Sequence, residues 1–128
     1  MIQVTCAIIV KEGKVLVTQR SEKMSLPLKW EFPGGKIEKN ETSDECLLRE
    51  LKEELNIEVK IQRKLTAAPY DYGTFSINLI PFIAHYISGE IILAEHKEYK
   101  WLSENELKDL DWAPADIPIV EEYLKLDI

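Results

Sequence analysis

Two β-rich runs open the pattern of hydrophobic and polar positions along the chain. "IQVTCAIIV" (2–10) and "KVLVTQR" (14–20) flank "KEGK" (11–14), a short polar stretch that contains glycine. Apolar runs on either side of such a stretch predict a β-hairpin. The next segment, "SEKMSLPLKWEFPGG" (21–35), contains two prolines, and we interpret it as a loop that closes on a Gly-Gly turn.

The spacing of apolar residues becomes helical from about Thr42 to Leu55. At about 100° per residue, four leucines fall on one helix face: Leu47, Leu48, Leu51 and Leu55. Three glutamates centre about 120° away from these leucines by the same arithmetic: Glu50, Glu53 and Glu54. One face of the helix is therefore predicted to pack, and a neighbouring face to present three carboxylates.

The second half of the chain alternates strand and helix patterns. "IEVKIQRKLTAA" (57–68), "FSINLIPFIAHYIS" (75–88) and "EYKWLS" (98–103) are predicted strands, with a candidate bulge at Pro81. Ser103 and Glu106 form a capping-box signature for a short helix. "DIPIVEEYLKL" (116–126) predicts a closing amphipathic helix with Pro118 in its first turn. This mixture predicts an α/β (α+β) sandwich in which a mixed sheet lies between helices.

Composition limits the classes of protein that fit this pattern. The 128 residues are 45% hydrophobic, which predicts one domain over 1–128. We find no apolar run of the ~20 residues that a membrane span needs, and no signal-peptide pattern in "MIQVTCAIIV". Cys6 and Cys46 are interpreted as reduced structural thiols of a cytoplasmic protein. The net charge of -7 disfavours a nucleic-acid polymer as partner, whereas acidic clusters bind divalent cations that accompany phosphates.

The acidic helix face is a candidate metal site. Mg²⁺ prefers hard oxygen ligands, and side chains at i, i+3 and i+4 can converge on one ion. Glu41 could support such a site, and Arg49 could hold a carboxylate through a bidentate pair. The alternative is a solvated charged face, which is common on exposed helices.

The wider spacing resembles the Nudix box, G-x5-E-x7-R-E-U-x-E-E-x-G-U, where U is aliphatic. The matching residues are Gly35, Glu41, Arg49, Glu50, Leu51, Glu53, Glu54 and Ile57. The one departure is Asn56, where the family usually has glycine. Because Asn tolerates positive φ better than other non-glycine residues, we expect Asn56 to take a left-handed conformation after the helix.

The resemblance implies a Nudix-type α/β/α sandwich and a hydrolase of nucleoside diphosphate linkages that uses Mg²⁺, with Mn²⁺ as a substitute. It implies that the metal is held by Glu50, Glu53, Glu54 and a backbone carbonyl near Gly34 and Gly35, and that Arg49 and Glu41 support the site. Metals neutralise phosphate charge and activate water, and a carboxylate then takes the proton. Which carboxylate acts as the base stays open.

Further segments are similar to the MutT-like branch of this family, which hydrolyses nucleoside triphosphates: "VTQR", "WEFPGGKIE", "EHKEYKWLS" and "WAPADIPIV". The resemblance implies that Arg20 reaches the substrate, although a surface cation at a strand end is the alternative. It also implies that an acidic residue before the last strand joins the metals and the catalytic groups. Glu95 is the best match and Glu98 its rival, and we expect His96 to be an exposed loop histidine without a partner.

Base recognition depends on Asp116 in "APAD", where MutT-like enzymes place a base-reading side chain. An ionised carboxylate only accepts hydrogen bonds, so it suits an exocyclic amino group such as cytosine N4. A protonated Asp116 could instead donate to a purine carbonyl, and a plain helix cap is a third interpretation. Tyr70, Tyr72 and Phe75 could stack on a base or pack in the core.

The sequence therefore predicts a metal-dependent nucleoside triphosphate pyrophosphohydrolase that releases monophosphate and pyrophosphate. We expect it to act on modified or non-standard nucleotides, with cytidine-type triphosphates favoured. The alternatives are an oxidised purine triphosphatase of the 8-oxo-dGTP type, an ADP-ribose or other nucleotide-sugar hydrolase, and a non-catalytic nucleotide-binding module. The expected partner is a small nucleotide, with no membrane, for a monomer or homodimer.

Overall fold

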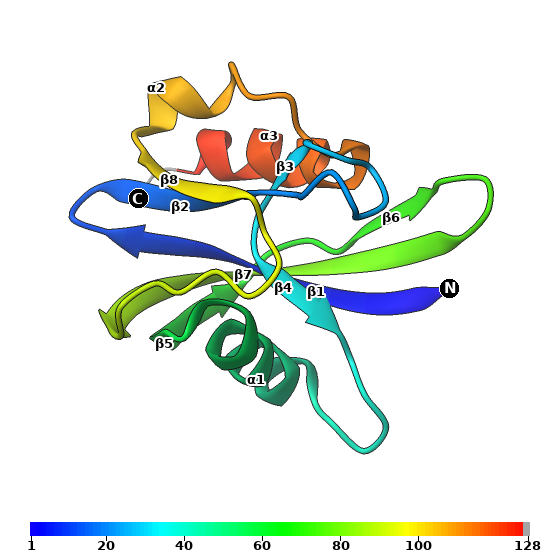
Figure 1. Cartoon of the computed structure of the whole chain (residues 1–128), viewed down its shortest axis with the longest axis horizontal. Helices are drawn as coiled ribbons and strands as arrows, with labels where there is room; N and C mark the ends of the chain where they lie inside the picture. The colour runs from blue at the N-terminus through cyan, green and yellow to red at the C-terminus, as the bar shows by residue number, and fades with distance from the viewer. Residues whose placement is uncertain (127–128) are drawn as a thin grey trace.

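The computed structural model describes residues 1–126 and shows a sheet between helices (Figure 1). Helix α1 (Ser43–Leu55) covers one face, and α2 (Glu104–Leu107) and α3 (Ile117–Lys125) lie on the other. A short 3-10 turn, η1 (Pro114–Asp116), leads into α3. The predicted α/β/α sandwich with a mixed central sheet is thus confirmed.

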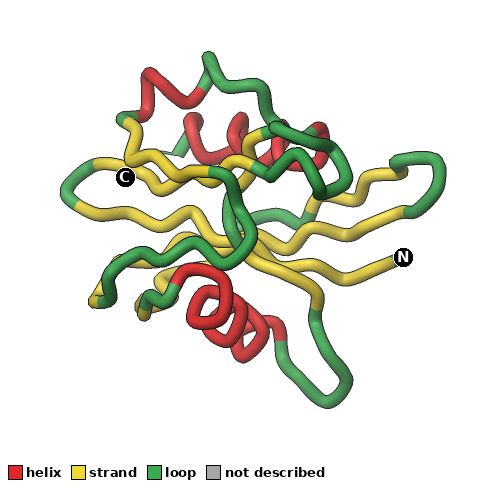
Figure 2. The backbone as a smooth tube through the Cα atoms, viewed as in Figure 1, coloured by secondary structure: helices red, strands yellow, loops and turns green. Residues whose placement is uncertain are grey.

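Eight strands form the sheet: β1 (Ile2–Lys11), β2 (Lys14–Gln19), β3 (Trp30–Glu31), β4 (Gly34–Lys36), β5 (Glu58–Lys64), β6 (Ala68–Asp71), β7 (Ser76–Ser88) and β8 (Glu98–Leu102). Their order is β3-β2-β1-β7-β5, while β4 pairs with β1, β6 with β7 and β8 with β2. The central pair, β1 and β7, is parallel, and the other pairs are antiparallel. The long strands and the loops that join them can be followed in Figure 2.

The predicted β1–β2 hairpin is confirmed. Lys11 pairs with Lys14 across a loop of two residues, Glu12 and Gly13. Both loop residues have positive φ, 50° and 78°, as the turn that matches the right-handed twist of a hairpin requires.

The core is split by the sheet into two clusters, because side chains alternate between the faces of a strand. On β1, Cys6 and Ile8 pack in the cluster that includes α3, whereas Ala7 and Ile9 pack with α1. Both faces are covered, which explains why β1 is a nearly continuous apolar run rather than an alternating one.

The prediction that Gly34 and Gly35 form a turn is wrong. These residues lie in β4, which pairs antiparallel with Thr5 and Cys6 of β1. A Cβ atom on Gly34 would overlap the backbone of Thr5 and Cys6. Glycine is required here because two backbones approach closely, and not because the chain reverses direction.

The predicted strand over 57–68 is in fact two strands, β5 and β6, which pair with successive parts of β7. The break lies opposite Pro81, whose oxygen accepts a hydrogen bond from the Leu65 amide at 2.9 Å. Proline has no N–H to donate to a neighbouring strand. The candidate bulge at Pro81 is also wrong. The pairing of β7 with β1 continues through Pro81, and the two irregularities in the β5–β7 pairing lie between Glu58 and Val59 and between Ile61 and Arg63.

Helix α1 begins and ends as its sequence predicts. Thr42 caps the start, and its hydroxyl accepts from the Glu45 amide while the Glu45 carboxylate accepts from the Thr42 amide. Asn56 ends the helix with φ 62° and ψ 35°, so the expected left-handed conformation is confirmed. One of the four predicted packing leucines, Leu48, is instead 45% exposed. Among residues 1–126, no helix is long and apolar enough to cross a membrane.

Candidate active site

A cavity of about 760 Å³ collects most of the predicted site residues. Helix α1 contributes Glu50 and Glu54 to its lining, and the loop before β8 contributes Glu95. Arg20 from the end of β2 and Asp116 from η1 also line it. Residues that are far apart in the chain, and that were predicted separately from the sequence, thus line one cavity.

The Glu50 carboxylate lies directly against Gly35. A Cβ atom on Gly35 would overlap Cδ and both carboxylate oxygens of Glu50, so the missing side chain leaves the room that this carboxylate fills. Burial raises the pKa of Glu50 above its ordinary value. Burial, followed by the charges of Glu95 and Glu50, also raises the pKa of Glu54. These carboxylates repel one another in partly buried positions, and a divalent cation would relieve that repulsion.

The donor chemistry therefore fits a hard cation such as Mg²⁺. Carboxylate oxygens and the backbone carbonyls of Gly34 and Gly35 are the ligand types that Mg²⁺ prefers, and Mg²⁺ retains several waters. Within residues 1–126, no three His, Cys, Asp or Glu side chains are already grouped as a set of metal ligands. Three carboxylates of the box, those of Glu41, Glu50 and Glu53, are instead bound by Arg49.

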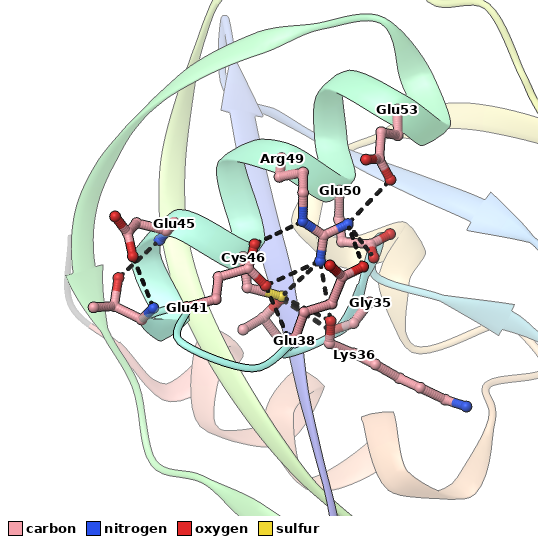
Figure 3. A network of polar contacts seen from close by, with 11 residues as sticks. Gly35, Lys36, Glu38, Glu41, Glu45, Cys46, Arg49, Glu50 and Glu53 are labelled. Carbon is pink, nitrogen blue, oxygen red and sulfur yellow. Dashed lines mark hydrogen bonds and ion pairs between the residues drawn. The ribbon is translucent and has the colours of Figure 1, made fainter.

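Arg49 binds carboxylates on two sides (Figure 3). Its Nε and Nη2 donate to the two oxygens of Glu41 at 2.6 and 3.0 Å, which is a bidentate pair. Its Nη1 donates to Glu50 and to Glu53, each at 3.0 Å. The hydrogen bonds from Arg49 lower the pKa of Glu41 to about 2. Glu41 thus stays ionised and orients Arg49 toward the acidic face of α1.

Glu53 differs from the other glutamates of the box. Its side chain is 58% exposed, and it does not line the cavity. It stays close to Glu50, because both carboxylates accept from the same nitrogen of Arg49 (Figure 3).

The loop that carries Glu95 is fastened to both neighbouring elements. The Ala94 amide donates to the Glu54 carbonyl at 3.1 Å, and the Lys97 amide donates to the Gln19 carbonyl at 2.9 Å. Glu95 therefore lies beside the end of α1 and lines the cavity. Its rival, Glu98, is an exposed residue of β8 that is absent from the lining.

The expectation that His96 is exposed and without a partner is wrong. Its side chain is only 4% exposed, and its Nε2 lies 2.8 Å from Oε2 of Glu31. The other oxygen of Glu31 accepts from Nη1 of Arg20 at 2.8 Å. Glu31 was not among the residues predicted from the sequence, because 21–35 was interpreted as a loop. A glutamate between the buried aromatic residues Trp30 and Phe32 was the available signal.

Asp116 is buried, and its Oδ2 accepts from the Phe32 amide at 2.9 Å. Burial, and then the charge of Glu31, raise the pKa of Asp116 well above its usual range. The side chain makes no capping hydrogen bond to α3. It belongs to the cavity wall rather than to the end of the helix.

Aromatic side chains stand next to Asp116. Tyr72 lines the cavity, and its hydroxyl accepts from the Ala115 amide at 2.9 Å. The rings of Tyr72 and Phe75 are 5.2 Å apart, and Phe75 also lines the cavity. Tyr70 packs on Tyr72 with ring centroids 4.6 Å apart and is absent from the lining. An apolar, aromatic wall with one carboxyl group is suited to a flat heterocycle.

Comparison with known proteins identifies the family of this chain. The NUDIX domain family matches residues 1–123. A CTP pyrophosphohydrolase of Escherichia coli K12 is 35% identical over 126 residues, covering 98% of this chain and 93% of that protein. An 8-oxo-dGTP diphosphatase of Haemophilus influenzae is 30% identical over 125 residues, covering 97% and 92%.

A solved structure extends the likeness to three dimensions. It is described as the DNA mismatch repair protein MutT, of the Nudix hydrolase family, from methicillin-resistant Staphylococcus aureus 252. It is 46% identical to this chain, with a TM-score of 0.78, and the match covers 96% of this chain and 95% of that one. Fold and site define the class of hydrolases that act on pyrophosphate bonds. Within that class, the chain belongs to the Nudix domain family.

Proposed function

We propose that this chain is a nucleoside triphosphate pyrophosphohydrolase that depends on Mg²⁺, or on Mn²⁺ as a substitute, and releases a monophosphate and pyrophosphate. The observation that carries the proposal is the single cavity that Glu50, Glu54 and Glu95 share with Asp116. It combines carboxylates for a cation with a wall suited to a nucleobase. The family match and the names of the two relatives support the same class of reaction.

In this proposal Glu50, Glu54 and Glu95 hold the metal with a carbonyl of Gly34 or Gly35. Glu53 is assigned as a further ligand, because Arg49 keeps it beside Glu50. When Mg²⁺ is bound, it neutralises phosphate charge and lowers the pKa of a water molecule. The protein supplies the base that accepts the proton of that water. Glu54 and Glu95 suit this role because they line the cavity without an arginine partner in the described residues.

We propose that Arg20, which is bound to Glu31 at the cavity wall, contacts the substrate. Its Nη1 binds Glu31, while its Nε and Nη2 bind the Ser25 carbonyl and hydroxyl at 2.6 and 3.0 Å. This arrangement holds the guanidinium at the cavity wall, where it can attract a polyphosphate.

The direct test is pyrophosphate release from a panel of nucleoside triphosphates and ADP-ribose, with and without Mg²⁺. Turnover of triphosphates should require the metal. Glu54→Gln should reduce kcat at least tenfold, about 1.4 kcal/mol of barrier, without loss of folding because a repulsive charge is removed. Lys60→Gln, at an exposed position of β5, serves as a matched control for an unrelated charge change. Metal-independent binding without turnover would instead indicate a non-catalytic module, and a preference for ADP-ribose would indicate a nucleotide-sugar hydrolase.

For the base, we propose cytidine-type triphosphates, including modified ones, in a cytoplasmic role of nucleotide-pool sanitisation related to DNA repair. An ionised Asp116 accepts from an amino group such as cytosine N4. Because burial raises its pKa, a protonated Asp116 could donate to the carbonyl of an oxidised guanine. The second candidate substrate is therefore 8-oxo-dGTP, the substrate class named for the Haemophilus relative.

The Asp116→Asn variant tests whether Asp116 contributes to recognition of the base. Asparagine keeps the acceptor for the Phe32 amide and adds a permanent donor. The ratio of kcat/KM for CTP over 8-oxo-dGTP should fall by the equivalent of about 1–3 kcal/mol, with metal dependence unchanged. An unchanged ratio would show that Asp116 does not read the base.

A further inference from the structure

His96 occupies a position that the proposed reaction does not use directly. It follows Glu95 in the loop before β8, and its buried side chain contacts Glu31 of strand β3. Its Nδ1 is buried without a hydrogen-bond partner in the described part of the chain, and its Nε2 contacts Glu31. An unsatisfied nitrogen in a buried imidazole costs folding free energy. A leucine would fill the same space without that cost, so stability alone does not explain a histidine here.

The contact with Glu31 has a definite direction. A carboxylate oxygen accepts hydrogen bonds, so the His96 tautomer that satisfies this contact carries its hydrogen on Nε2 and donates it to Glu31. The second oxygen of Glu31 is occupied by Arg20. The Glu31 carboxylate thus connects His96, which follows Glu95 in the chain, to Arg20, which lines the cavity.

The backbone shows why this side-chain link matters for Glu95. The loop is fastened at Ile92 and Ala94 to the end of α1, and at Lys97 to Gln19 of β2. Between Ala94 and Lys97 no backbone hydrogen bond to another element is recorded within residues 1–126. His96 lies in this interval, and its side chain connects the residue after Glu95 to β3, as the Ala94 amide connects the residue before Glu95 to α1.

We propose that His96 is a positioning residue. Through its hydrogen bond to Glu31, it keeps the Glu95 carboxylate and the Arg20 guanidinium at fixed positions relative to each other in the cavity. The inference rests on the proposed function, because it takes Glu95 as a metal ligand and Arg20 as a substrate contact. Groups that orient metal ligands in this way typically contribute 10–100-fold to metal affinity or activity.

The experiment measures Mn²⁺ binding by electron paramagnetic resonance, together with kcat and KM for CTP, in the chain of 128 residues. His96→Ala should weaken Mn²⁺ binding about 10- to 100-fold and raise KM for the nucleotide. His96→Gln places an amide N–H near the position of Nε2, so it should restore most of the binding. His85→Ala is the matched control, because His85 lies on β7, contacts Gln62 of β5 and does not line the cavity. It should change neither quantity.

A double-mutant cycle identifies the contact through which His96 acts. In a Glu31→Ala background, which has no side-chain acceptor for His96, the His96→Ala change should cause little further loss, because the two changes break the same link. Full additivity would overturn the proposal. So would a His96→Gln variant that binds Mn²⁺ as weakly as His96→Ala while remaining folded, since glutamine keeps an N–H donor that alanine lacks.

Glu95→Gln distinguishes failure of this inference from failure of the proposed function. If Glu95→Gln weakens Mn²⁺ binding and His96→Ala does not, only the positioning role is wrong. If Glu95→Gln leaves both Mn²⁺ binding and turnover unchanged, then Glu95 is not a ligand, and the proposed metal site must be redrawn.

Discussion

At the scale of single residues, Asn56 shows how backbone conformation can be predicted from one position. It ends α1 in the left-handed region, and its amide donates to carbonyls of the last helical turn, Leu51 and Lys52. Its Nδ2 also donates to the Glu90 carbonyl at 3.2 Å, which connects the end of the helix to the loop before β8. The residue thus ends the helix and anchors the start of the loop that carries Glu95.

We predict that Asn56→Val will destabilise the protein by about 1–2 kcal/mol, because a β-branched residue is strained at positive φ. Asn56→Gly should be nearly neutral, since the relief of φ strain offsets the loss of an exposed side-chain hydrogen bond. Urea denaturation of the three proteins measures both effects. Equal stability of the valine and glycine variants would contradict the conformational explanation.

The surroundings of some residues could not be predicted from the sequence, because their partners lie far away along the chain. The box residues lie in one helix and the segment before it, so their spacing alone predicts which side chains meet. His96 depends on Glu31, 65 positions away, and Asp116 depends on Phe32, 84 positions away. A partner at such a distance is determined by the packing of the sheet. The pattern of one segment therefore indicated an exposed histidine where the fold buries it.

At the scale of elements, the close contact between β4 and its neighbours positions the acidic face of α1. Gly34 is pressed against the backbone of β1, and Gly35 against the carboxylate of Glu50. The two glycines were predicted from the sequence to lie near the metal, but in a turn rather than in a strand. A pair of glycines is equally compatible with a turn and with a crowded strand, and only the pairing with β1 decides between them.

The two glycines should respond differently to the same substitution. A methyl group at Gly34 meets backbone atoms, which cannot move aside, so Gly34→Ala should cost about 1–3 kcal/mol of stability. A methyl group at Gly35 meets the end of a flexible side chain, so Gly35→Ala should cost less stability but displace Glu50 and weaken Mn²⁺ binding. Melting temperature and metal titration of both variants provide the measurement. A Gly35→Ala protein with normal metal affinity would show that the position of Glu50 is not critical.

At the scale of the whole molecule, the sheet brings the glutamates of the proposed metal site and the aromatic residues next to Asp116 to one cavity. The hairpin, the box helix and the layered class of fold were predictable, because each follows from local periodicity or from a resemblance. The parallel pairing of β1 with β7 was not, since it joins Ile2 to Ile77 and depends on which strands complete a common core. That pairing puts the box near the β6–β7 hairpin and η1, so that carboxylates and aromatic residues line one cavity.

Because one cavity serves both ligands, metal and nucleotide binding should be thermodynamically coupled. In the presence of a non-hydrolysable CTP analogue and Mg²⁺ together, the rise in melting temperature should exceed the sum of the rises with each alone. A ligand at 100 times its Kd stabilises the folded state by about 2.7 kcal/mol, which corresponds to roughly 5–15 °C for a chain of this size. Glu54→Gln should reduce the Mg²⁺ contribution and the coupling, whereas Asp116→Asn should reduce only the contribution of the cytidine analogue. Strictly additive shifts in the wild-type protein would mean that the carboxylates and the base wall act as independent sites, and the proposed assignment of both to one nucleotide would have to be abandoned.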